Sequence, residues 1–124
     1  LGAPGCGLTP WGDKEVITAP DPAVPPIRLE TMNGRRLVVM RVPTGGWTLG
    51  VDRAEVTPEG RRVFVTVRRP DPAFMHTQAF VDLRALTDVP ESTPIEVVAR
   101  VLDRHERPDG KVYARAEPVA EFDE

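Results

Sequence analysis

The side chains that could perform nucleophilic or metal chemistry are few in this sequence and lie far apart. Ser92 is the only serine, and no G-x-S-x-G motif surrounds it. His76 and His105 stand singly, whereas a zinc site needs three or four convergent His, Cys or carboxylate ligands. Neither G-x-x-x-x-G-K-[ST] nor G-x-G-x-x-G occurs, so no phosphate-binding glycine loop is indicated. We therefore predict a protein that is not an enzyme and that uses no metal or cofactor.

Cys6 has a more specific chemical interpretation. It is the only cysteine, so it cannot form an internal disulfide and the fold does not depend on an oxidising compartment. The stretch APGC at residues 3–6 is similar to a bacterial lipobox, in which the cysteine carries lipid. The stretch departs from that pattern because Ala3 replaces a large apolar residue, and lipobox cleavage would remove residues 1–5. Cys6 is therefore a candidate lipid anchor.

Charge is distributed unevenly along the 124 residues, although the net charge is only -3. Residues 28–69 carry nine arginines against four acids, whereas residues 70–124 carry twelve acids against six basic residues. These two stretches could face each other within one domain or present surfaces of opposite sign. The pI of about 5.4 and the aromatic content of 6% argue against nucleic acid as a partner. No run of about 18 apolar residues is present to span a membrane.

Residues 1–26 form a proline-rich segment that holds six of the fourteen prolines. Proline fixes φ and cannot donate a ladder hydrogen bond, so we expect an extended arm or tether with little sheet. An ordered arm of this kind must lie against its own domain or against a partner. Its large apolar residues Trp11, Val16 and Ile17 are the predicted anchors.

From Ile27 onward, apolar residues alternate with polar ones, the pattern of half-buried strands. Turn signals separate the alternating segments, and Asn33-Gly34 is a strong hairpin signal. A change of face near Asp52-Arg53 predicts a β-bulge, and a loop of about ten residues is expected after residue 83. The predicted strands are residues 27–32, 35–42, 47–56, 61–69, 77–83, 95–103 and 111–117.

About seven short strands without a helical period predict an all-β fold, a small antiparallel β-sandwich or partly open barrel. We predict that this domain covers residues 27–117 and that residues 118–124 form an acidic tail.

A Pro-Thr-Gly-Gly turn precedes Trp47, one of two tryptophans. Gly45 and Gly46 are expected to adopt positive φ, and Trp47 to begin a strand on the buried face. The functional alternative is that the loops at residues 43–46 and 70–78 flank one end of the domain. Phe74, Met75 and His76 would then be exposed as a protein-binding surface.

Residues 43–79 are similar to the small β domain at the C-terminus of PrcB-like proteins, which are described as protease-complex stabilising subunits. The resemblance implies a β fold and an envelope protein that acts through contacts. The matching residues are Pro43, Thr44, Gly45, Gly46 and Trp47, then Pro70 and Pro72, then Thr77, Gln78 and Ala79.

The function predicted from these features is that of a non-catalytic, extracytoplasmic accessory or extrinsic subunit. It would bind and stabilise a larger, membrane-associated protein complex, in the periplasm or on the outer face of a bacterial membrane. Association with the membrane would be indirect or through lipid on Cys6. The alternatives are a regulator or inhibitor of an envelope protease, which the resemblance suggests, and a small-ligand binding domain with an apolar cavity between its sheets.

Overall fold

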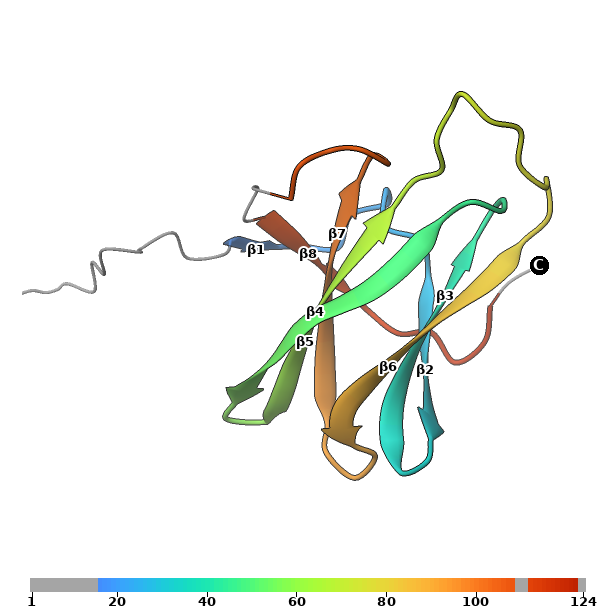
Figure 1. Ribbon diagram of the computed structural model, residues 1–124. Coiled ribbons are helices and arrows are strands. Elements are labelled where there is room, and N and C mark those ends of the chain that lie inside the picture. Colours follow the sequence, from blue (N-terminus) through green and yellow to red (C-terminus); the bar gives the residue numbers. More distant parts are fainter. Residues whose placement is uncertain (1–15, 109–111, 123–124) are drawn as a thin grey trace, which may run out of the picture.

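The computed structural model describes residues 16–108 and 112–122, and every regular element in these residues is a β-strand. No helix capable of crossing a membrane occurs in this part of the chain. The strands, labelled in Figure 1, are β1 (Val16–Thr18), β2 (Ile27–Met32), β3 (Arg35–Val42), β4 (Thr48–Thr57), β5 (Gly60–Arg68), β6 (Val81–Pro90), β7 (Ile95–Leu102) and β8 (Val112–Ala116).

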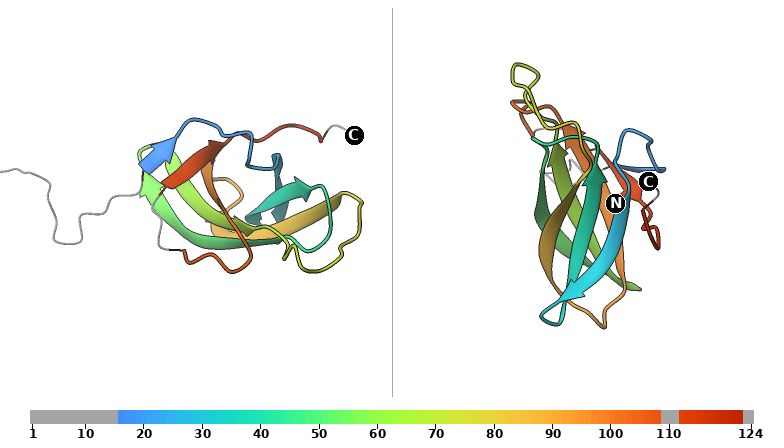
Figure 2. Two further views of the ribbon diagram at one scale, coloured as in Figure 1. Left: turned by 90° about the horizontal axis from the view of Figure 1, so that it is seen from above. Right: turned by 90° about the vertical axis from the view of Figure 1, so that its right-hand side faces the viewer.

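The strands form two sheets that pack face to face, which confirms the predicted all-β sandwich (Figure 2). One sheet has five strands in the order β1-β8-β7-β5-β4, and the other has three in the order β2-β3-β6. Two pairs, β1–β8 and β5–β7, are parallel, whereas the sequence predicted antiparallel pairing. The chain makes the β5–β7 pair parallel by passing through the other sheet, as β6, between the two strands.

The main core lies between the two sheets and consists largely of alternating valines. Strand β3 contributes Val38, Met40 and Val42, and β5 contributes Val63, Val65 and Val67, all with side chains essentially inaccessible to solvent. Burying each such side chain contributes about 1.5–3 kcal/mol to folding. A second, smaller cluster of Phe64, Val98 and Tyr113 lies on the outer face of the five-stranded sheet. Phe64 and Tyr113 meet edge to face there, with ring centroids 5.0 Å apart.

Two local predictions are confirmed. Asn33 and Gly34 have φ of 54° and 78°, and positive φ at both central residues is typical of a type I′ hairpin turn. The β4–β5 register shifts between Val51 and Arg53, at the predicted bulge.

The prediction for residues 77–94 is wrong in its boundaries. The strand begins at Val81 rather than Thr77, and it continues to Pro90 where a loop was expected. Ala85, Thr87 and Val89 are buried, because the alternation persists beyond Leu83. Pro90 is tolerated because it is the last residue of an edge strand.

Both ends of the described chain pack against the sandwich, so the folded unit is wider than residues 27–117. Strand β1 extends the five-stranded sheet beyond β8, and Ile17 packs against the Phe64 cluster. Near the other end, the Val119 amide donates to the Ile27 carbonyl (2.9 Å). Phe122 lies under the guanidinium groups of Arg28 and Arg41, 5.0 and 4.8 Å from its ring centroid.

The basic and acidic stretches face each other within the domain. Arg41 of β3 makes two hydrogen bonds to the Asp82 carboxylate of β6, at 2.8 and 3.2 Å. Arg62 pairs with Glu96 at 3.0 Å in the same way, between β5 and β7. The uneven charge along the sequence therefore reflects cross-strand pairing between its two halves.

Candidate functional site at the loop end

Three of the longer connections gather at one end of the sandwich, shown at the top of Figure 1. We call this end, formed by residues 43–47, 69–80 and 103–108, the loop end. The Gly45 amide donates to the Thr77 carbonyl (2.9 Å), and the Arg104 guanidinium donates to the Gly46 carbonyl. The loops that the sequence placed at one end therefore do adjoin each other.

Gly46 allows the 43–47 and 69–80 segments to pack closely because it has no side chain. Its φ of +91° suits glycine, and an added Cβ would lie 2.5 Å from Nδ1 of His76 and 2.7 Å from Cβ of Pro70. Gly45 differs from the expectation because its φ is not positive, and one such residue is enough for this reversal. His76 is half-buried rather than exposed, with Nε2 3.0 Å from the Asp71 carbonyl oxygen, so its ring braces the loop.

Trp47 connects the loop end to the core. Its half-buried ring packs against the main core beside Leu49 and Val51. The indole Nε1 donates to the Thr44 hydroxyl at 3.2 Å, which satisfies the polar group of the ring. The tryptophan therefore holds the 43–47 turn against the sandwich.

Asp71 organises the start of the 69–80 loop. Its carboxylate accepts the Ala73 amide (2.8 Å), and Nε2 of His105 lies 3.3 Å from the other carboxylate oxygen. The pKa of Asp71 is lowered, first by the Ala73 hydrogen bond and further by His105, against an opposing contribution from desolvation. The Phe74 amide also donates to the Asp71 carbonyl (3.1 Å), which closes a turn directly before Met75.

The 69–80 loop carries three large apolar side chains into solvent. Met75 is 99% exposed, Phe74 67% and Phe80 63%. Phe74 and Met75 were predicted from the sequence, whereas Phe80 was missed because it was placed in a strand that begins later. The Arg41 guanidinium stacks over Phe80 at 5.9 Å. A cavity of about 480 Å³, lined by Pro70, Pro72 and residues 103–106 among others, lies within the loop end.

The other predicted contact residues lie elsewhere. Val16, which is exposed, and Ile17 belong to β1 at the edge of the five-stranded sheet. Trp11 and Cys6 lie outside the described residues.

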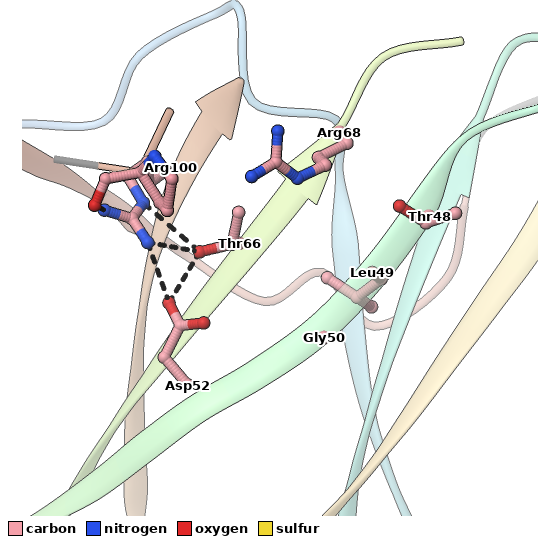
Figure 3. Close-up of a pocket in the computed structure, with 8 residues that line it drawn as sticks. Thr48, Leu49, Gly50, Asp52, Thr66, Arg68 and Arg100 are labelled. Atoms are coloured by element: carbon pink, nitrogen blue, oxygen red, sulfur yellow. Dashed lines mark hydrogen bonds and ion pairs between the residues drawn. The ribbon is translucent and has the colours of Figure 1, made fainter. Parts of the chain in front are cut away.

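A polar network occupies the outer face of the five-stranded sheet (Figure 3). The Thr66 hydroxyl lies 2.6 Å from an Asp52 carboxylate oxygen and accepts two hydrogen bonds from Arg100 (3.0 and 3.2 Å). The Tyr113 hydroxyl donates to the same Asp52 oxygen at 2.9 Å. Burial raises the pKa of Tyr113, and the hydrogen bond to Asp52 raises it further.

Neither region presents a metal site: within residues 16–108 and 112–122, no group of three or more His, Cys, Asp and Glu side chains converges to hold a metal ion. No protein-family model matches the chain, and no curated protein or solved structure matches it either.

Proposed function

We propose that this protein is a non-catalytic accessory protein that binds a larger protein complex through the loop end. The observation that carries this proposal is the exposure of Phe74, Met75 and Phe80 on one loop that backbone hydrogen bonds tie to neighbouring segments. Large apolar side chains that project into water from a braced loop are typical of interface hot spots.

The bracing contacts also favour binding. The Arg69 amide donates to the Leu102 carbonyl (2.8 Å) at the start of the loop, and the Gly45 amide donates to the Thr77 carbonyl (2.9 Å) near its end. A loop that is ordered before it binds loses less conformational entropy on association, so more of the contact energy remains as affinity. This is the arrangement expected of a docking surface that is formed in advance.

The partner we propose is a membrane-associated complex outside the cytoplasm. This proposal follows the resemblance of residues 43–79 to PrcB-like domains. The same resemblance supports a second candidate, regulation of an envelope protease, because residues 43–46 and 70–78 both lie within the loop end. In that case Phe74 and Met75 would contact the protease, and replacing either would relieve its regulation.

A crosslinking experiment tests the contact surface. A photo-crosslinking amino acid replaces Met75 in one variant and Val56 in another, and both variants are expressed in cells that produce the protein natively. Val56 is a suitable control because it is 78% exposed and lies next to the β4–β5 turn, at the opposite end of the sandwich (Figure 1). We expect one defined protein adduct from position 75 and none from position 56. Equal adducts from both positions, or none from position 75, would contradict the proposal.

Size separation of gently solubilised native membranes tests the larger claim. Comigration with a large assembly supports an accessory subunit, and the composition of that assembly identifies what it serves. Migration as a free species, outside any assembly, would contradict stable membership of a complex.

A further inference from the structure

We infer that the outer face of the five-stranded sheet contains a binding site for a carboxylate, centred on Arg68 and Gly50. The pocket there has a volume of about 340 Å³ and lies beside the Asp52–Thr66–Arg100 network (Figure 3). It is separate from the exposed apolar side chains of the loop end, and the inference does not rest on the proposed function.

Gly50 is the first observation. It lies within β4 at an extended position, directly opposite Thr66, and an added Cβ would meet nothing within 4 Å. Neither backbone conformation nor packing therefore requires glycine, although glycine weakens a strand interior relative to residues with side chains. What glycine does provide is open space over the sheet, beside the two arginines of the pocket.

Arg68 is the second observation. Its Nη1 lies 2.9, 3.2 and 2.8 Å from the carbonyl oxygens of Asp103, Arg104 and Glu106, which fix the plane of the guanidinium. Within the described residues, its Nε and Nη2 make no hydrogen bond. These two nitrogens form one edge of the guanidinium, the geometry that binds a carboxylate through two parallel hydrogen bonds. Figure 3 shows the group projecting over the pocket between Arg100 and Thr48.

The surrounding groups select a single negative charge. Arg100 is held by Asp52 (3.6 Å) and Thr66, so one of the two positive charges is already balanced. Among the described residues that line the pocket, two arginines stand against one carboxylate, and this formal balance of one positive charge suits one carboxylate better than a multiply charged phosphate. Thr48 is the cross-strand partner of Arg68 and adds a hydroxyl that can donate to the second side of the ligand.

A carboxylate could come from a peptide chain end or from an acidic side chain, and the same chemistry recognises both. The test uses the full ¹⁵N-labelled chain and three probes: acetylated trialanine with a free carboxyl end, the same peptide with an amide end, and N-acetyl-glutamic acid α-amide. The readouts are the NMR signals of the Gly50 amide and the Arg68 Nε–H. We expect saturable shifts with the carboxylates at millimolar concentrations and none with the amide.

A response to trialanine alone identifies the chain end, and a response to the glutamate alone identifies the side chain. Both outcomes support the site. If both carboxylates fail to produce saturable shifts up to about 50 mM, the proposed site is overturned.

Two variants test the geometry. Gly50→Leu fills the open space without meeting any atom at its Cβ, so the chain should fold normally and bind at least about tenfold more weakly. Arg68→Lys keeps the charge but removes the two-nitrogen edge, and a loss of about tenfold is expected. Arg115→Lys is the control, because Arg115 lies on the same sheet outside the pocket and should leave binding unchanged. Unchanged affinity in Gly50→Leu would overturn the inference even if Arg68→Lys disturbed the 103–106 backbone.

Discussion

The strands of the sandwich are joined differently at its two ends. We expect one end to matter mainly for the stability of the fold and the other mainly for binding a partner. At the lower end of Figure 1, the connections are the tight turns at Asn33-Gly34, Pro58-Glu59 and residues 91–94. At the loop end, residues 69–80 and 103–108 extend well beyond the strands. We call the first the tight end.

The two ends also differ in how far their contacts rely on side chains. At the tight end, backbone packs on backbone: the Arg61 amide donates to the Pro94 carbonyl (3.0 Å), and Gly60 lies against the same carbonyl. At the loop end, several contacts pass through side chains, such as those of Arg68, His76 and Arg104. A contact made by a side chain can be removed by one substitution without moving the backbone, so the loop end can be tested contact by contact in a way that the tight end cannot.

The largest effect should come from Gly60→Ala at the tight end. The added Cβ would lie 2.1 Å from the Pro94 carbonyl oxygen, so two backbone segments must separate. We expect the free energy of unfolding to fall by about 3 kcal/mol, measured by urea denaturation. Gly34→Ala is the control: its Cβ meets nothing within 4 Å, and only its φ of +78° should cost about 1 kcal/mol. If the free energy of unfolding falls equally in the two variants, the close approach of Gly60 to Pro94 does not add to the cost of the substitution.

Phe74→Ala should affect binding without affecting folding. The side chain is 67% exposed, so its removal should change the free energy of unfolding by less than about 0.5 kcal/mol. Affinity for the partner found by crosslinking should fall by about 2 kcal/mol, measured by titration with the purified partner. Val56→Ala at the opposite end should change neither quantity. A large loss of stability in Phe74→Ala would show that the loop is part of the folded core.

Gly46→Ala tests the loop end by the same means as Gly60→Ala tests the tight end. Its Cβ would approach the His76 ring, which can rotate, and Cβ of Pro70, which can move away only with the loop backbone, and the φ of +91° remains unfavourable. We expect a loss of about 1–2 kcal/mol in thermal or urea unfolding. Adding His76→Ala should recover part of this loss. Gly45→Ala should cost less, because its Cβ would lie 3.6 Å from the nearest atom; a larger loss there would contradict this account.

The smallest effect concerns Asp71, which has a pKa lowered from 3.8. A lowered folded-state pKa adds stability above the unfolded value, and this stability is lost as pH falls through the folded pKa, below pH 3.8. In His105→Asn, the pKa should rise but stay below 3.8, because the Ala73 amide is the larger cause. NMR titration of the carboxyl carbon measures this value. A midpoint at 3.8 would show that His105 supplies the main effect.

Local signals in the sequence predicted the fold class and several details. Asn33-Gly34 and the change of face at Asp52-Arg53 act through the backbone of a few residues, so they can be recognised without the rest of the chain. The parallel β5–β7 pair could not be predicted, because the alternating pattern of each strand is the same whichever direction its neighbour runs.

At the candidate sites too, features set by neighbouring residues could be predicted, whereas features that depend on distant parts of the chain could not. Exposed Phe74 and Met75 were predictable from a proline-braced loop. The burial of His76 was not, because it depends on Gly46, a residue from another connection. The pocket at Gly50 and Arg68 also escaped prediction, since it combines β4, β5 and β7 with carbonyl groups of residues 103–106.

The parallel β5–β7 pair has a consequence for the timing of folding during synthesis. Arg61 pairs with Ile95, and β6 must cross to the other sheet between them. Such long-range pairing folds slowly, because the intervening chain must be ordered before the contact forms. A growing chain that ends before Ile95 lacks Val97 and Ala99, so the inner face of β5 has no neighbour on that side. The core can therefore close only after β7 has been made and has left the ribosome.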